Sequence, residues 1–407
     1  MMRWIRTAAV SVFLMLAVIP LAGCQKRQYE RIEIDYDEFQ ERGSSGGRTS
    51  AAADEAGIQI DGSSAEGGGT DQNEDGKTAG NAAADGEPAE RSELALLFGG
   101  DILLSDHVLS AYQKAGGIGG VLDKEYRQVI QKADFFMANE EFPFSTRGTA
   151  AEDKQYTFRI PPEKVSLFKD MGIDAVTLAN NHALDYGADA LLDSVETLDG
   201  AGILHTGAGE NLEQAQKPVI YEQNGIRVGI LGATRVMPDS GWAAGSHHPG
   251  MLATYDPGIL LGAIKELRET CDYVVVFVHW GVEKEDMPQE YQRTLGQQYL
   301  DAGADLVIGS HPHVLQGVEY YKGKPIVYSL GNFVFGSSIP RTALLRVSLK
   351  KDSQTGIGAS LQLLPGTSGA GYTRMFPEGE KRQEFFRYME QISFGVSYDE
   401  QGMAVPK

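Results

Sequence analysis

The chain has 407 residues, of which 42% are hydrophobic, and it carries a formal net charge of -20 at pH 7. This composition is that of a globular protein and excludes a fibrous or wholly disordered one. The strong negative charge argues against nucleic acid or an anionic lipid surface as a partner, because both would be repelled.

The first 23 residues are typical of an export signal that ends at a lipidated cysteine. Arg3 and Arg6 precede an apolar run over residues 8–19, and a Leu-Ala-Gly-Cys sequence that ends at Cys24 follows it. The run is shorter than the about 20 apolar residues that span a bilayer, so a cleaved lipoprotein signal is favoured over a permanent transmembrane helix. We therefore expect acylation of Cys24 and a lipid-anchored location on the extracellular face of the cell membrane.

Residues 24–92 form a second region, which is rich in Gly, Ala, Ser, Asp and Glu. Large apolar residues are almost absent after Phe39, so this segment cannot bury enough surface to fold. We interpret it as a flexible acidic tether between the lipidated cysteine and the folded part of the chain.

From residue 93 onward, short apolar runs alternate with amphipathic stretches, which is typical of strands interleaved with helices. Strands are predicted at 94–98, 135–138, 175–178, 273–278 and 306–308, and helices at 162–171, 188–198, 258–269 and 289–302. The predicted fold class is therefore α/β (α+β).

Two dipeptides that tolerate positive φ in tight turns predict β-hairpins. Asn224-Gly225 lies within 219–232, and Lys322-Gly323 lies within 318–329. A third pair of apolar runs follows at the C-terminal end, so the sheets should be mixed rather than purely parallel. We assign 93–340 to the main domain and 341–407 to C-terminal strands and a helix that complete it.

Each of the five predicted strands ends in side chains that bind metals or move protons. In open α/β sheets the carboxyl ends of the strands form the crevice where ligands bind, so these clusters are expected to meet. In chain order they contain Asp101, then Asn139, Glu140 and Glu141, then Asn180, Asn181, His182 and Asp185, then His279, and finally His311 and His313. Such a ligand set without Cys suits Mn²⁺, Fe²⁺, Zn²⁺ or Mg²⁺, and a bound ion of this kind activates water for hydrolysis.

Taken singly, these clusters have ordinary structural explanations. An isolated Asp101 is more often a helix cap or turn residue, and His279 in an apolar strand is more often a satisfied core histidine. His311 and His313 are harder to explain in this way, because an extended backbone would place both imidazoles on one side. The joint occurrence favours a site, since four of the eight histidines lie in the clusters; the other four, assigned to structure or surface, are His107, His205, His247 and His248.

These motifs, in this order, resemble the CapA family of poly-γ-glutamate capsule proteins. The resemblance covers about residues 93–336. It rests on Asn180-Asn181-His182, His279-Trp280-Gly281, Gly309-Ser310-His311-Pro312-His313 and Ser329-Leu330-Gly331-Asn332-Phe333, which are specific when they occur together. It implies a calcineurin-like metallophosphoesterase fold, in which two mixed sheets pack face to face with helices outside.

The resemblance also implies roles for individual residues. The implied metal ligands are Asp101, Asn139, Glu141, Asn181, His279, His311 and His313, and the implied catalytic residues beside them are His182 and Asp185. His182 would stabilise or protonate a leaving group. Two positions depart from the phosphoesterase pattern, because Leu103 replaces a histidine and Glu141 replaces an aspartate. Both departures are CapA-like and argue against plain phosphoesterase activity and a complete two-metal centre.

The sequence leaves two main functions open. One is a metal-dependent hydrolase or transferase that acts on the capsule polymer or on a related extracellular ester or amide. The other is a non-catalytic accessory of a membrane poly-γ-glutamate synthase that exports or retains the polymer. A generic extracellular phosphoesterase is a third interpretation, which Leu103 disfavours. The expected partners are the anionic polymer, the membrane through the lipid, and the synthase complex.

Overall fold

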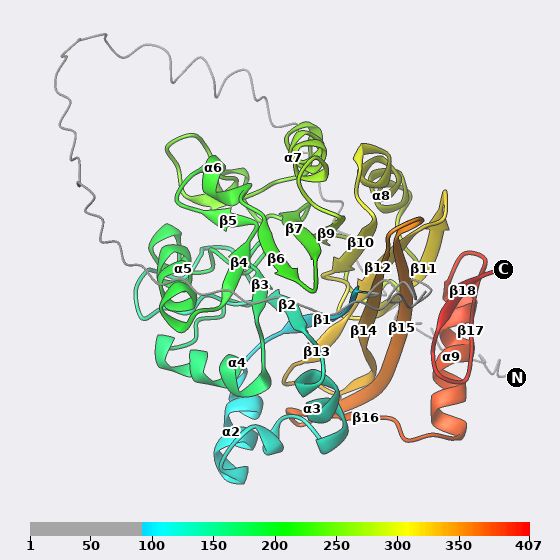
Figure 1. Ribbon diagram of the computed structural model, residues 1–407. Coiled ribbons are helices and arrows are strands. Elements are labelled where there is room, and N and C mark those ends of the chain that lie inside the picture. Colours follow the sequence, from blue (N-terminus) through cyan, green and yellow to red (C-terminus); the bar gives the residue numbers. More distant parts are fainter. Residues whose placement is uncertain (1–91) are drawn as a thin grey trace, which may run out of the picture. The chain divides into compact units, whose positions relative to one another are not determined.

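Two mixed β-sheets packed face to face form the framework of residues 92–407, which are the residues that the computed structural model describes (Figure 1). Helices lie on the outer faces of both sheets, so the predicted fold class is confirmed. The predicted export signal, Cys24 and the acidic tether lie outside the described residues.

The first sheet has the spatial order β16-β15-β14-β1-β2-β3-β4, with β13 beside β1. Strands β1 to β4 run parallel to one another, whereas β14, β15 and β16 are antiparallel additions. The strands are β1 (Ser92–Ile102), β2 (Phe135–Glu140), β3 (Ala175–Thr177), β4 (Leu204–Thr206), β13 (Asn332–Val334), β14 (Ile339–Asp352), β15 (Gly356–Gly369) and β16 (Tyr372–Met375).

The second sheet has the order β11-β12-β10-β9-β7-β6. Both predicted hairpins are confirmed as its antiparallel edges, β6–β7 and β11–β12. Their turn residues Asn224 and Lys322 have φ values of 54° and 51°. The strands are β6 (Val219–Gln223), β7 (Ile226–Thr234), β9 (Tyr273–His279), β10 (Leu306–Ser310), β11 (Leu315–Tyr321) and β12 (Lys324–Leu330).

Amphipathic helices cover each sheet from outside. Helices α2 (Asp106–Ala115), α3 (Lys124–Gln131), α4 (Ser166–Met171) and α5 (Ala188–Ala201) pack on the first sheet, and α7 (Gly258–Arg268) and α8 (Glu290–Ala302) pack on the second. Shorter elements are η1 (Ile118–Gly120), η2 (Pro162–Val165), η3 (Ser240–Trp242), α6 (Leu212–Ala215), and the strand pairs β5 (Ala208–Gly209) with β8 (Gly250–Met251) and β17 (Val396–Tyr398) with β18 (Ala404–Pro406). Within the described residues, no helix is both long and apolar enough to cross a bilayer.

The space between the sheets is filled by a continuous apolar core. Phe98 of β1 meets Phe277 of β9 edge to face, with ring centroids 6.4 Å apart. Burying a large apolar side chain stabilises a fold by about 1.5–3 kcal/mol, so this apolar interface holds the two sheets together. At the carboxyl ends of β1, β2, β9 and β10 the lining becomes polar instead.

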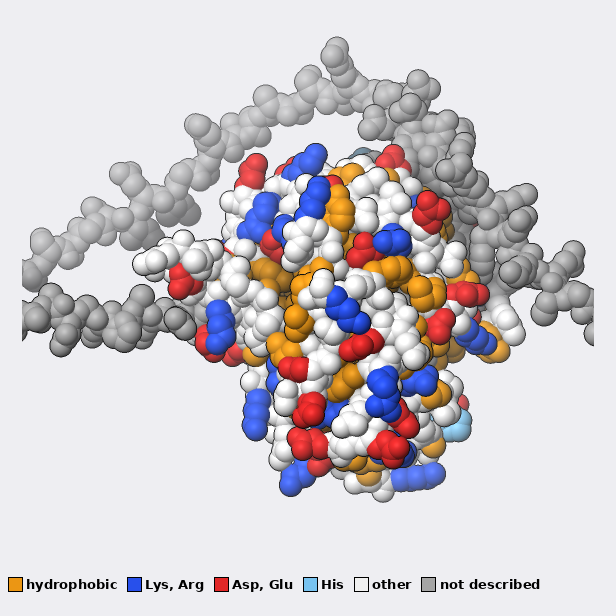
Figure 2. All heavy atoms as spheres, turned by 90° about the vertical axis from the view of Figure 1, so that its right-hand side faces the viewer, with side chains coloured by type: hydrophobic (Ala, Val, Ile, Leu, Met, Phe, Trp, Pro, Cys, Tyr) orange, Lys and Arg blue, Asp and Glu red, His pale blue; other side chains and the backbone are white. Residues whose placement is uncertain are grey.

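The C-terminal segment closes one end of this core. Helix α9 (Glu380–Ile392) buries Phe385 and Phe386 in the same apolar cluster. Strand β14 runs through residue 340, so the segment is continuous with the first sheet. On the face that carries α9, acidic and basic side chains are interspersed with apolar ones (Figure 2).

Candidate metal centre

Two groups of three buried or half-buried side chains meet where strands of both sheets end. Glu141, His279 and His311 form one group, and Asp101, Glu141 and His313 form the other; within each group the candidate ligand atoms all lie within 4.8 Å of one another. Glu141 belongs to both groups. The structure therefore gathers five residues that are distant in the sequence.

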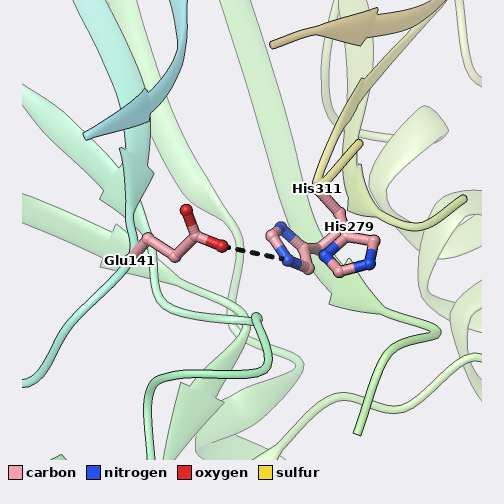
Figure 3. A group of neighbouring side chains, drawn as sticks. All are labelled: Glu141, His279 and His311. Carbon is pink, nitrogen blue, oxygen red and sulfur yellow. Dashed lines mark ion pairs between the residues drawn. The ribbon is translucent and has the colours of Figure 1, made fainter. Parts of the chain in front are cut away.

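Glu141 points toward His279 and His311 (Figure 3). Its Oε1 lies 3.6 Å from His279 Nε2, and its Oε2 lies 3.8 Å from His313 Nδ1. Both oxygens, and Nδ1 of His311, are buried without a hydrogen-bond partner among the described residues. A buried polar atom without a partner is costly and calls for an explanation. A divalent cation supplies one, so these residues fit such an ion.

Asp101 is held in place by a close approach of two backbone segments. Its N–H donates to the carbonyl oxygen of Gly331 at 2.8 Å. A Cβ at Gly100 would lie 1.8 Å from that same oxygen, so only glycine fits there. Gly331 itself has a φ of 58°. The glycine of the Ser-Leu-Gly-Asn-Phe motif thus lies where the two backbone segments approach each other closely.

His279 is oriented by hydrogen bonds on both ring nitrogens. Its Nδ1 lies 2.9 Å from the Ser310 hydroxyl, and its Nε2 lies 2.7 Å from Oδ1 of Asn181. Ser310 is an outer-shell partner of the kind that fixes the direction of a metal-binding imidazole, whereas Asn181, itself a predicted ligand, lies on the Nε2 side of the ring. The arrangement turns Nε2 toward Glu141 and Asn181.

Asn139 joins the cluster through hydrogen bonds to its neighbours. Its amide nitrogen donates to Asp101 Oδ1 at 2.8 Å, and its amide oxygen accepts from Asn180 at 3.0 Å. In this arrangement Asn139 orients the carboxylate of Asp101. Direct ligation of a metal ion by Asn139 remains a prediction.

The prediction of an extended backbone at His311 and His313 is wrong. The two residues do not lie on an extended backbone, because their φ values are 98° and 58°. A non-glycine residue in this region is uncommon and strained, and such strain concentrates at functional sites. The turn places the two imidazole centroids 5.9 Å apart and directs them to different ligand groups.

Burial and charge shift the pKa values of the cluster in opposite directions. Burial lowers the pKa of His279 and of His311 well below the usual range. Burial raises the pKa of Glu141, and the charge of Asp101 raises it further. Burial also opposes the charged form of His313, but the carboxylates of Glu141 and Asp101 outweigh it and raise its pKa to about 10. The first two histidines are therefore neutral, as metal ligation requires.

His182 lies beside the cluster and forms a pair with Asp185. Its Nδ1 is 2.7 Å from Asp185 Oδ2, and its backbone N–H donates to Asn180 Oδ1 at 3.0 Å. Burial lowers the pKa of the imidazole, against the opposing effect of Asp185. His182 lies in the turn between β3 and α5, and its backbone hydrogen bond to Asn180 stabilises that turn.

Two residues at the site were missed by the sequence reasoning. Asn332 Oδ1 lies 2.8 Å from His313 Nδ1, and β13 pairs Asn332 with Asp101. Its place in the Ser-Leu-Gly-Asn-Phe motif was a usable signal. Lys154 contacts His182, with its Nζ 3.0 Å from Nδ1. It lies between the predicted strand at 135–138 and the predicted helix at 162–171, beyond the polar cluster at the strand end, so no signal identified it.

Other residues that the sequence singled out have structural or surface positions. Leu103 is buried in the apolar layer outside the first sheet and supplies no ligand. Trp280 is fully buried and donates from Nε1 to the Tyr328 carbonyl at 2.9 Å, so it belongs to the core. Of the four histidines assigned to structure or surface, His107, His247 and His248 are exposed, and His205 pairs with Asp199.

Fold and site together define a mixed α/β protein with a candidate metal centre between two sheets. Residues 95–337 match the profile of the bacterial capsule synthesis protein PGA_cap family. The matched range includes most of the described residues and every residue of the cluster. The chain belongs to this family.

Named relatives agree with this assignment. The PGA biosynthesis protein CapA of Bacillus subtilis is 35% identical over 264 residues, which are 64% of this chain and 68% of that protein. The capsule biosynthesis protein CapA of Bacillus anthracis is 34% identical over 281 residues, 66% of each chain. A probable polyglutamine synthesis accessory protein of Mycobacterium tuberculosis is 30% identical over 249 residues, 57% of this chain and 65% of that one. The matches thus span about two thirds of the relatives' lengths.

Solved structures give weaker likenesses. A hypothetical protein from Thermus thermophilus has a TM-score of 0.40 at 16% identity and covers 66% of this chain and 99% of its own. The sulfate thiohydrolase SoxB of the same organism has a TM-score of 0.40 at 13% identity, covering 69% of this chain and 57% of its own.

Proposed function

We propose that this protein is a membrane-anchored extracellular component of poly-γ-glutamate capsule biosynthesis, with a divalent metal centre of hydrolase type. The observation that carries the proposal is the buried carboxylate of Glu141, which is shared by two ligand groups and has no hydrogen-bond partner among the described residues. The names of the two Bacillus relatives support the capsule polymer as the substrate or cargo.

The residues divide into those that hold an ion and one that handles a proton. Glu141, His279 and His311 would hold a divalent ion, and Asp101 and His313 offer a second position beside Glu141. A bound Mn²⁺, Fe²⁺, Zn²⁺ or Mg²⁺ would lower the pKa of a coordinated water and polarise a substrate oxygen. His182, oriented by Asp185, would give a proton to the leaving group of an amide or ester.

Purified protein tests the catalytic part of the proposal. Poly-γ-glutamate would be incubated with the protein in the presence of Mn²⁺ or Zn²⁺, or with EDTA, and its chain length followed by gel electrophoresis. We expect metal-dependent shortening that is lost in Glu141→Gln and His182→Ala. If both variants bind and process the polymer as the parent does, the hydrolase role is excluded.

A second function is favoured by two observations. The Mycobacterium relative is named as an accessory protein, and Leu103 supplies no ligand where phosphoesterases have a histidine. A non-catalytic subunit of the synthase would bind the polymer without shortening it and would do so equally well in EDTA. Capsule that is still exported by cells carrying His182→Ala, but not by cells lacking the protein, would establish this accessory role.

The anchor is tested separately at Cys24, which lies outside the described residues. Cys24→Ala should prevent acylation and release the protein into the medium, because one residue carries the whole lipid attachment. Labelled fatty acid that is incorporated equally by the parent and by Cys24→Ala would exclude this site of attachment.

A further inference from the structure

Residues 145–159 form a loop whose two ends are tied together. The backbone N–H of Ser145 donates to the Ile160 carbonyl at 2.9 Å, and that of Ile160 donates to Pro143 at 3.0 Å. Compact loops with joined ends are often functional. From this base the loop reaches the turn after β3, where His182 lies.

Lys154 is the contact between the loop and that turn. Its ammonium group donates to the Asp185 carboxylate and to the Asn181 carbonyl, and it lies 3.0 Å from His182 Nδ1. The side chain is only 12% exposed. A lysine is rarely buried unless it is paired, so the three partners account for its position.

Asp185 accepts hydrogen bonds from the loop through both its side chain and its backbone. Its Oδ2 accepts from the Phe158 N–H at 2.7 Å, and its carbonyl oxygen accepts from the Ala151 N–H at 2.8 Å. The same Oδ2 lies 2.7 Å from Nδ1 of His182. One fully buried carboxylate therefore holds the loop and the imidazole at the same time.

The loop also covers the imidazole ring itself. The Phe158 ring lies against His182, with centroids 4.5 Å apart and an interplanar angle of 36°. With Lys154 beside Nδ1 and Phe158 on one face, the ring is enclosed by residues of the loop. Lys154 therefore lies at the same ring nitrogen that Asp185 contacts.

We propose that Lys154 is a positioning residue, which couples the docking of the 145–159 loop to the orientation of His182. The proposal rests on the proposed role of His182 beside the metal centre. A loop that must dock before the imidazole is aligned would admit an extended polymer first and complete the site afterwards.

The loop offers a matched control at its other anchor. Arg147 binds Asp193 of α5 through three nitrogen-oxygen contacts, of which Nε to Oδ2 is 3.0 Å. No contact between Arg147 and Asp185 or His182 is recorded in the described residues. Arg147→Met therefore loosens the loop without removing a partner of the imidazole.

The test reads the imidazole in metal-free protein rather than turnover. Ring ¹⁵N signals of histidine would be recorded at one fixed pH in EDTA, with the His182 signal assigned by its loss in His182→Ala. We expect Lys154→Met to move or broaden that signal, Lys154→Arg to move it part of the way, and Arg147→Met to leave it in place. Chymotrypsin cleavage at Tyr156, which is 62% exposed, should become several-fold faster in both Lys154→Met and Arg147→Met.

Two results would overturn the proposal. One is an unchanged His182 signal in Lys154→Met, or in Lys154→Arg should the methionine variant not fold. The other is an equal change in Arg147→Met, which would assign the effect to the loop as a whole. Because no substrate is used, either result can be obtained whether or not the protein shortens the polymer.

Discussion

The two sheets contribute chemically different halves of the candidate metal centre. The first sheet supplies carboxylates and amides, through Asp101, Glu141 and Asn181, whereas the second supplies the imidazoles of His279 and His311. His313 also follows a strand of the second sheet. Neither half is a complete site for an ion that takes both oxygen and nitrogen ligands. The candidate site exists only where the sheets are packed together, so binding of an ion there would be linked to sheet packing.

The largest effect on the contribution of the first sheet is expected from removal of the one carboxylate that both ligand groups share. Glu141→Gln keeps the size of the side chain but removes its charge, and we expect the bound metal to be lost. The affinity should fall by more than the roughly 10–100-fold that follows loss of an outer-shell partner. Metal content after gel filtration, measured by mass spectrometry, checks this.

Glu283 provides the matched control for that substitution. It is exposed and close enough for its charge to raise the pKa of Glu141. Glu283→Gln should retain the metal. An equal loss of metal in the two variants would mean that general negative charge, and not ligation by Glu141, holds the ion. Full retention in both would exclude Glu141 as a ligand.

The two histidines in the turn after β10, His311 and His313, can be tested separately for their part in holding metal. His311 and His313 belong to different ligand groups, so in a two-ion centre either alanine substitution should remove about half of the metal measured per chain. In a one-ion centre, one of the two variants should lose all the metal and the other little. His205→Ala, away from the cluster, should lose none, and a loss there would point to unfolding.

Removing the metal should lower thermal stability by a smaller amount. A ligand at a hundredfold excess over its Kd stabilises the folded state by about 2.7 kcal/mol, which corresponds to several degrees in Tm. We expect EDTA to lower the Tm of the parent, measured by calorimetry, and to leave that of Glu141→Gln unchanged. If EDTA lowers the Tm of both proteins equally, the stabilisation does not come from a metal held by Glu141, and the proposed link between metal binding and sheet packing fails.

The smallest effect concerns the neighbouring carboxyl on the first sheet. Glu140 is fully buried, and neither of its oxygens has a hydrogen-bond partner among the described residues. Burial raises its pKa well above the usual value, so its ionisation penalises the folded state increasingly as pH rises above the unfolded value of about 4.3. Glu140→Gln should therefore raise the Tm at pH 8 and have little effect near pH 4. An equal gain at both pH values would exclude ionisation as the cause.

The strands that build the site could be predicted from the sequence, and the backbone that presents the imidazoles could not. Continuous apolar runs predicted β1, β2, β9 and β10, and the rule that ligands bind at carboxyl ends then indicated which polar residues would converge. The turn at His311 and His313 depends on positive φ values that no sequence pattern requires of histidine. Their convergence was predicted, but the reason given for it was wrong.

Long-range contacts account for the rest of what the sequence did not reveal. Strands β4, β5, β8 and β13 have only two or three residues, which is too short for a hydrophobic period. Asn332 reaches the site because β13 pairs with β1, and Lys154 because a loop folds back onto Asp185. Both placements depend on tertiary packing rather than on local preference.

Anomalous diffraction from crystals grown with Mn²⁺ or Zn²⁺ tests the central claim most directly. The account predicts a peak within coordination distance of Glu141 and of His279 or His311, with ligands from both sheets. A peak elsewhere, or ligands that all come from one sheet, would contradict it.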